Sequence, residues 1–159
     1  MKRYCDLTGE PECIGILPGP GTELILTGTQ VHTEPEKLRD HPLAVRLAAE
    51  CDLHFWFGGA PSAPFYTVPR SVVFAHDSLG GYFLTREHPA LDWSEPVYYI
   101  DPEHRCFRLA KAGENLADMG GRWREAMVPS VVFEVFRDRA AAQLRFAILD
   151  PKQLLEEER

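Results

Sequence analysis

The sequence SVVFAHDSLGGYFLT, residues 71–85, contains two short runs of apolar and aromatic residues separated by a turn rich in Asp, Ser and Gly. This pattern predicts two adjacent antiparallel strands, because β-branched and aromatic residues favour strands and Gly and Asp favour tight turns. Similar runs lie on both sides of it. We expect further strands at 53–57, 65–68, 96–100 and 105–109, with a tight turn at Asp101–His104. The short connections indicate an antiparallel meander.

The segment before the meander has the signals of two short helices. Thr33 and Glu36 have the spacing of a capping box, which predicts a helical turn at 34–39. Pro42 interrupts that turn, and Asp40 is available to cap a second helix. We expect this second helix at 42–51, where apolar residues recur at helical spacing. A strand is expected at 22–31, ahead of both.

The segment after the meander changes period. Leu116, Met119, Trp123 and Met127 recur at intervals of three and four, which predicts an amphipathic helix at 113–127 that Gly120-Gly121 weakens. Residues 131–136 favour a strand, whereas 140–149 are compatible with helix or strand. The expected fold class is α+β, an antiparallel β-sheet meander flanked by helices.

The length favours a single domain over residues 1–159, because one domain is the usual expectation for a chain of this size. Residues 1–21 contain Pro-Gly punctuation and are expected to be an irregular lead-in. Residues 152–159 are expected to be a frayed acidic tail.

The chain is acidic, with a net charge of −7. This charge argues against a nucleic-acid partner, which would require basic patches to displace counterions from phosphates, and against an anionic membrane surface. It favours encounter with a basic protein. The N-terminus lacks the apolar stretch of a signal peptide, and no apolar run is long enough to span a membrane, so we expect a cytoplasmic protein.

The sequence contains no recognisable catalytic, metal-binding or phosphate-binding motif. The six histidines show no HxxxH or HExxH spacing, and the four cysteines show no CxxC pair, so neither a metal site nor a cofactor is predicted. Pro18–Gly21 lacks the lysine and hydroxyl of a phosphate loop. His76, Asp77 and Ser78 are neighbours in sequence, an arrangement that rarely has the geometry of a catalytic triad. No catalytic residue is predicted.

The three tryptophans have different contexts. Trp123 belongs to the apolar face of its predicted helix and Trp56 lies in an aromatic run, so both are expected in the core. Trp93 lies in the polar stretch 89–95, where an exposed aromatic residue would suit a binding surface and a buried one would fold back onto its own domain.

The stretch VVFAHDSLGGYFLT followed by PVYYID, within residues 72–101, resembles the SUKH superfamily. In that family a helix follows these strands, as 113–127 would here, so the resemblance covers about residues 70–127. It implies an α+β fold with a curved antiparallel sheet, and a non-enzymatic module that binds another protein. Many bacterial members are immunity proteins that neutralise toxins, often nucleases. The matching turn positions are Asp77, Gly80, Gly81, Tyr82, Tyr99 and Asp101.

We therefore expect a protein-binding module, of the immunity type, whose partner is a basic protein. The residues expected to contact the partner are Asp77, Trp93, Asp101 and Glu103. The alternative is a small-ligand-binding protein or hydrolase-type enzyme with a pocket on the sheet face, using His54, His76 or Asp77. A homo-oligomer formed through an edge strand is also compatible with the sequence.

Overall fold

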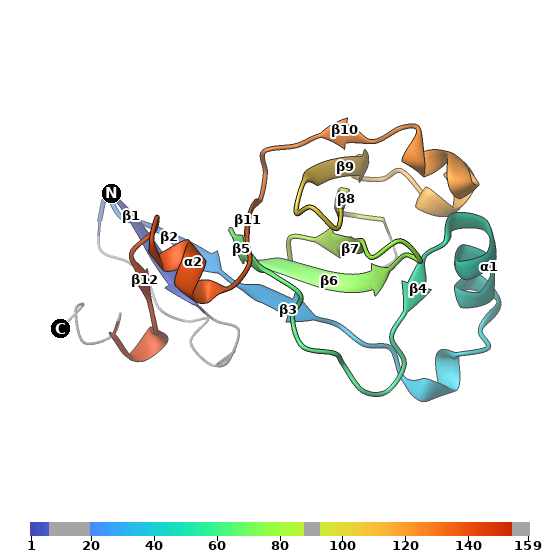
Figure 1. Cartoon of the computed structure of the whole chain (residues 1–159), viewed down its shortest axis with the longest axis horizontal. Helices are drawn as coiled ribbons and strands as arrows, with labels where there is room; N and C mark the ends of the chain where they lie inside the picture. Colours follow the sequence, from blue (N-terminus) through green and yellow to red (C-terminus); the bar gives the residue numbers. More distant parts are fainter. Residues whose placement is uncertain (7–19, 88–92, 154–159) are drawn as a thin grey trace. The chain divides into compact units, whose positions relative to one another are not determined.

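The computed structural model describes residues 1–6, 20–87 and 93–153. The chain divides into two compact units (Figure 1). Unit 1 comprises residues 1–30, 63–71 and 133–159, and unit 2 comprises residues 31–62 and 72–132. The expectation of one domain over 1–159 stays a prediction.

Unit 2 is built on the predicted meander. Its strands follow one another across the sheet in the order β10-β9-β8-β7-β6, and β4 pairs with β6 as well. The bounds of β3 straddle the division between the units, since only Val31 of this strand belongs to unit 2. Every step from β6 to β9 is antiparallel, which confirms this part of the predicted meander, and β10, which the sequence did not predict, adds a further antiparallel strand beside β9. The strands are β3 (Thr29–Val31), β4 (His54–Phe55), β6 (Ser71–His76), β7 (Tyr82–Thr85), β8 (Val97–Ile100), β9 (Cys106–Ala110) and β10 (Val128–Pro129).

Helix α1 (Pro42–Cys51) has the predicted bounds but a different cap. The ring nitrogen Nδ1 of His41 accepts a hydrogen bond from the backbone N–H of Leu43, so His41 rather than Asp40 is the N-cap. The preceding turn η2 (Glu36–Leu38) begins after Pro35 and has no side-chain cap, so the predicted capping box is wrong.

The predicted helix at 113–127 is shorter and tighter than expected. It forms η3 (Leu116–Arg124), a 3-10 helix that is broken at Gly120, where φ is +55°. Asn115 caps it by accepting from the backbone N–H of Ala117. The break follows from the Gly120-Gly121 pair, because glycine takes up a positive φ without steric cost.

The core of unit 2 lies between the sheet and the pair α1 and η3. Trp123 is fully buried, and its ring centroid lies 5.0 Å from that of Phe83 and 5.1 Å from that of Tyr99. Its indole Nε1–H donates to the backbone carbonyl of Cys51 over 2.6 Å, which joins η3 to the end of α1. The prediction that Trp123 is a core residue is confirmed.

Unit 1 differs from the expectation in two ways. Residues 2–6, placed by the sequence in an irregular lead-in, form strand β1 (Lys2–Asp6). β1 lies between β2 (Glu23–Thr27) and β12 (Ile148–Leu149) and is parallel to both, although only antiparallel pairing was expected. A parallel partner lies far away in sequence, so local turn signals do not reveal it.

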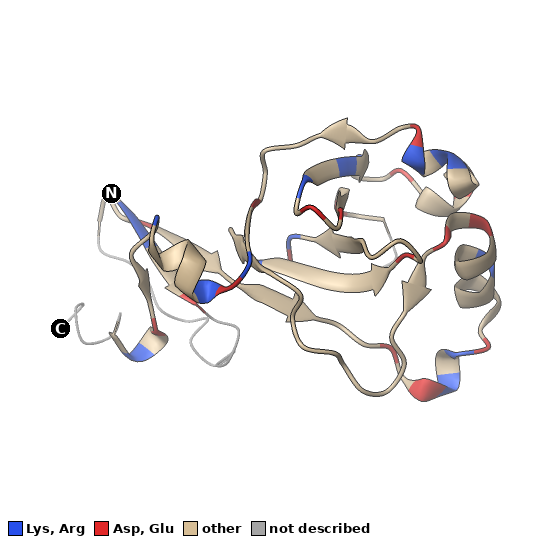
Figure 2. Ribbon diagram, in the orientation of Figure 1, with Lys and Arg blue, Asp and Glu red and all other residues tan. Residues whose placement is uncertain are grey.

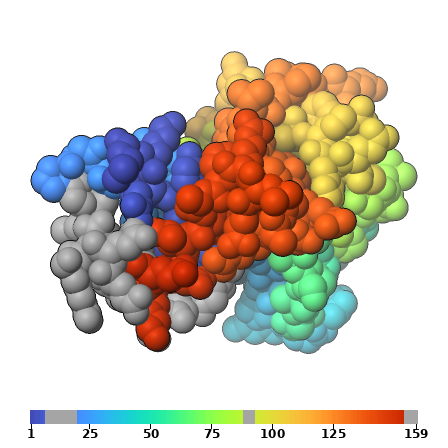
Figure 3. Space-filling model, turned by 60° about the vertical axis from the view of Figure 1, so that its left-hand side comes forward, coloured from blue at the N-terminus to red at the C-terminus, as the bar shows by residue number. Residues whose placement is uncertain are grey.

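Unit 1 combines β1 from the start of the chain with β12 from its last third (Figure 3, blue and red). β5 (Tyr66–Val68) was expected in the meander, but it pairs with β11 (Glu134–Phe136). The ambiguous stretch 140–149 is both helix and strand, because α2 (Arg139–Gln143) precedes β12. Residues 7–19 of the lead-in and 154–159 of the predicted tail lie outside the described residues. Within the described ranges, no helix has the length and apolar character needed to cross a membrane.

Replacing Leu47 by Ala tests the core of unit 2. Leu47 is fully buried on α1, and the lost apolar contacts and remaining cavity should lower the free energy of unfolding by about 2 to 5 kcal/mol. Urea-induced unfolding measures this change. Val45 lies on the same helix and is 53% exposed, so Val45→Ala should change stability by less than about 0.5 kcal/mol. Equal effects of the two substitutions would contradict the assigned packing of α1.

Candidate functional site

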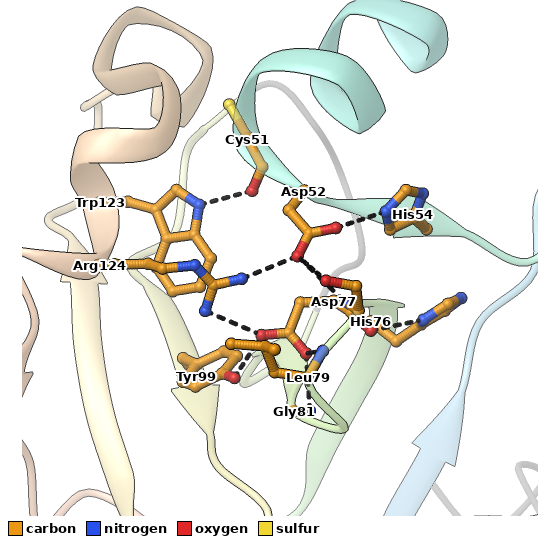
Figure 4. A network of polar contacts seen from close by, with 11 residues as sticks. Cys51, Asp52, His54, His76, Asp77, Leu79, Gly81, Tyr99, Trp123 and Arg124 are labelled. Carbon is orange, nitrogen blue, oxygen red and sulfur yellow. Dashed lines mark hydrogen bonds and ion pairs between the residues drawn. The ribbon is translucent and has the colours of Figure 1, made fainter.

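The guanidinium of Arg124 binds two carboxylates at one end of the unit 2 sheet (Figure 4). Its Nη2 lies 2.8 Å from Asp52 Oδ2, and its Nη1 lies 3.1 Å from Asp77 Oδ2. Arg124 is the last residue of η3, Asp52 follows α1, and Asp77 follows β6. The group that these contacts connect, called the Arg124 network below, consists of Asp52, His54, Asp77, Ser78, Tyr99 and Arg124.

Asp77 organises the turn between β6 and β7. Its side chain is fully buried, and Oδ1 accepts from the backbone N–H groups of Leu79 and Gly81 at 3.0 and 2.8 Å. The hydroxyl of Tyr99 on β8 donates to Oδ2 over 2.5 Å. A Cβ at Gly81 would collide with the Tyr99 ring, so glycine is required there for close approach.

Asp52 joins α1 to β4 and to the same turn. It ends α1 in the left-handed conformation, with φ of +52°. Its Oδ1 accepts from His54 Nε2 at 2.7 Å, and Oδ2 accepts from both the hydroxyl and the backbone N–H of Ser78, at 2.6 and 3.0 Å. Four donors therefore surround Asp52, including Arg124.

The network keeps both carboxylates ionised. Burial raises the pKa of each, but at Asp77 the hydrogen bonds from Tyr99, Gly81 and Arg124 outweigh it and lower the pKa. At Asp52, burial is outweighed by Ser78 and His54, and the pKa falls to about 2. Burial, together with the hydrogen bond to Asp77, raises the pKa of Tyr99.

The hydrogen bonds of Asp52, His54 and Ser78 fit a structural role and differ from those of a catalytic triad. In a Ser-His-acid triad the histidine stands between the serine and the carboxylate and takes the proton of the serine. Here Ser78 and His54 both donate to Asp52, so the hydroxyl of Ser78 is hydrogen-bonded to the carboxylate and not to the imidazole. Oxygens that are already saturated by donors within the chain are poor general bases.

A row of partly exposed aromatic rings, called the aromatic stripe, crosses the strands beside this network. His54 on β4 lies opposite His76 on β6, which lies opposite Tyr82 on β7. The ring of Trp56 lies 5.1 Å from His76 and 6.2 Å from Tyr82 between centroids, and the two imidazole rings are 5.5 Å apart. The aromatic stripe consists of His54, Trp56, His76 and Tyr82.

Trp56 corrects an expectation from the sequence. It was placed in the core because it lies in the run LHFWF, but it is only partly buried. Side chains alternate across a strand, so Phe55 and Phe57 face the core and Trp56 faces away from it with His54. Alternation within LHFWF was a signal that could have revealed this face.

Two of the four residues predicted to contact a partner are buried turn residues. Asp77 belongs to the Arg124 network. Asp101 is 8% exposed, and it accepts from the backbone N–H groups of Glu103 and Arg105 and from Arg105 Nε. Each carboxylate is thus occupied by donors of its own chain.

The other two predicted contacts have opposite environments. Trp93 is 9% exposed and packs in the core of unit 2, which agrees with the alternative that it folds back. Residues 88–92 of its polar stretch lie outside the described residues. The side chain of Glu103 is 74% exposed at the β8–β9 turn, so a partner can reach it directly.

The sequence did not reveal that Asp52 and Arg124 belong to the site. They are 72 residues apart, and neither lies in a recognisable motif. The structure does bring together Asp77, Gly81 and Tyr99, which were singled out as turn positions, and it places His54 and His76 beside them. In the described part of the chain, no group of three or more His, Cys, Asp or Glu residues is arranged to hold a metal ion.

Comparisons with known proteins give no match. No family model, no curated protein and no solved structure is significantly similar to this chain. The resemblance to the SUKH superfamily therefore stays a prediction, and function is argued from the geometry of the site.

Asp77→Asn tests whether the network stabilises the fold. The substitution removes the charge and points an NH2 group at neighbouring donors, so the free energy of unfolding should fall by about 1 to 3 kcal/mol. Urea-induced unfolding measures the loss. Asp40→Asn, at an exposed position before α1, is the matched control and should have little effect. Equal stability of Asp77→Asn and the parent would contradict the structural role.

The pH dependence of stability tests Asp52. Its pKa is lowered to about 2 in the folded chain, so its contribution is complete above the unfolded pKa of about 3.9 and is lost as the pH falls toward 2. In Asp52→Asn the loss of stability between about pH 6 and 2.5 should be smaller by about 1 to 2 kcal/mol, allowing for partial exposure of the carboxylate. Parallel curves for variant and parent, measured by urea unfolding at each pH, would show that Asp52 contributes nothing.

Proposed function

We propose that this chain is a non-enzymatic protein-binding module for a basic partner, and that it acts as an immunity protein that neutralises a basic toxin. The first part rests on the partly exposed aromatic stripe on an acidic unit. The second part follows from the resemblance of residues 70–127 to the SUKH superfamily.

The aromatic stripe carries the proposal. Tyrosine and tryptophan are enriched at the centres of protein interfaces, because a rigid ring contributes a large contact area at a small cost in entropy. The faces of Trp56 and Tyr82 also attract the cationic side chains of Lys and Arg. Unit 2 holds more Asp and Glu than Lys and Arg, so its charge favours the same kind of partner.

The Arg124 network supports binding by holding the stripe in place. Asp52 binds His54 directly, and the backbone carbonyl of Asp77 lies 3.1 Å from His76 Nδ1. A surface that is already ordered loses less conformational entropy when it binds. The network thus serves as a support for the stripe.

Glu103 is a second contact that the proposal retains from the predicted set. Its carboxylate is exposed at the β8–β9 turn, where Asp101 fixes the backbone. Asp77 and Asp101 fix the backbone of the turns in which they lie, and Trp93 packs in the core of unit 2. The proposal therefore does not retain these three residues as direct contacts with the partner.

Affinity capture tests the proposal. The tagged chain is exposed to extract of its native cell at low and at high salt, and bound proteins are identified by mass spectrometry. We expect a stoichiometric basic partner that is lost at high salt, because charge attraction between exposed groups is screened. Trp56→Ala should weaken capture about tenfold or more, as is usual for an aromatic residue at the centre of an interface.

A pair of surface variants tests whether Glu103 contacts the partner. Glu103→Lys should weaken capture, while Val131→Ser, at a 97% exposed position, should not. Absence of any partner at both salt concentrations would contradict the proposal and favour the small-ligand alternative. Light scattering on the same sample reports whether the chain associates with itself.

A further inference from the structure

A groove runs beside α1 in unit 2 and consists of two hollows that share Ala44, Phe55 and Phe57. The smaller hollow has a volume of about 170 Å³ and is also lined by Leu38 and Leu43. The wider hollow has a volume of about 520 Å³ and extends along the outer side of α1. Together they are called the α1 groove below.

The smaller hollow has the size and character of a socket for one large apolar group. Its walls are mainly aliphatic and aromatic side chains. A cavity of about 150 Å³ lined by such residues stays dry and accepts a benzene-sized ring. The hollow therefore matches a Phe or Leu side chain.

The charged residues at the α1 groove are of both signs. Glu34 lies at one end, where Oε1 is 3.2 Å from His32 Nε2, and no residue in the described ranges donates to Oε2. Arg39, which lines the wider hollow, pairs with Glu36, and Arg46 pairs with Glu50, each over 2.6 Å, so the charges within each pair largely cancel. Figure 2 shows acidic and basic residues close together on η2, and acidic residues at the C-terminal end of α1. Residues 34–52 contain five Asp and Glu and three Lys and Arg, which leaves a small acidic excess.

The groove is continuous with the aromatic stripe. His54 belongs to the stripe and also lines the wider hollow, and Phe55 lies next to it on β4. His54 is therefore the residue at which the aromatic stripe and the wider hollow adjoin.

We propose that the α1 groove receives a large apolar side chain of the basic partner, flanked in that partner by Lys or Arg. The proposal rests on the protein-binding function proposed above and specifies the segment that is recognised. The apolar anchor enters the smaller hollow, and a flanking cation faces Glu34. Apolar burial supplies affinity, and the charges select a basic segment.

Three synthetic pentapeptides test the groove, with binding followed by NMR shifts of the Leu38, Leu43 and Ala44 methyl groups. The first has Phe between two pairs of Lys, the second has Ala in place of Phe, and the third has Glu in place of Lys. The first should bind about tenfold more tightly than the second, as expected for burying one large apolar side chain. It should also bind more tightly than the third, with a difference that salt reduces.

Two variants place the binding site. Ala44→Leu fills both hollows and should weaken binding of the Phe peptide about tenfold, whereas Ala140→Leu, an exposed position on α2 in unit 1, should leave it unchanged. Glu34→Gln, which keeps the shape of the side chain, should weaken binding of the Phe peptide severalfold.

Equal binding of the Phe and Ala peptides, or binding unaffected by Ala44→Leu and Glu34→Gln, would overturn the inference. So would a neutral probe, 2-phenylethanol, binding as tightly as the Phe peptide, or dimerisation of the chain that Ala44→Leu abolishes. If Trp56→Ala abolishes capture of the whole partner and Ala44→Leu does not, the inference about the groove fails while the proposed function stands.

Discussion

The placement of Arg124 between the carboxylates of Asp52 and Asp77 is the interaction on which unit 2 depends. It joins the end of η3 to the end of α1 and to the β6–β7 turn, which are distant in sequence. The preceding residue, Trp123, fills the core and donates to the carbonyl of Cys51. Two consecutive residues thus complete the apolar and the polar contacts, and a shift of η3 would break both. The cost of leaving a buried carboxylate without its partners keeps this arrangement in place.

The same interaction bears on function. A network in which the carboxylate oxygens already accept several hydrogen bonds is rigid and poorly suited to proton transfer. It lies beside a row of aromatic rings, one of which, His54, also lines the α1 groove. Rigid rings, an apolar hollow and an excess of negative charge are the features that support the proposed binding of a basic protein.

Unit 1 is built from strands that lie far apart in the sequence. Its parallel sheet takes β1 and β2 from the start of the chain and β12 from near its end, and its second pairing takes β5 from the middle and β11 from the last third. The apolar side chains of this unit form clusters of their own, around Tyr66 and Ile148 and around Cys5. Long-range pairing of this kind requires three separate segments of the chain to meet before the strands can form their hydrogen bonds.

Local patterns in the sequence determined the meander from β6 to β9, the bounds of α1, and the apolar face of η3 with Trp123 at its centre. These features depend on neighbouring residues and on turn chemistry, which a single sequence displays. Only the tertiary structure decided the parallel pairing in unit 1 and the burial of Asp77 and Asp101. Above all, it decided that Arg124 binds Asp52 and Asp77. Contacts between residues so far apart along the chain leave no period or spacing in the sequence, because they are set by how whole elements pack.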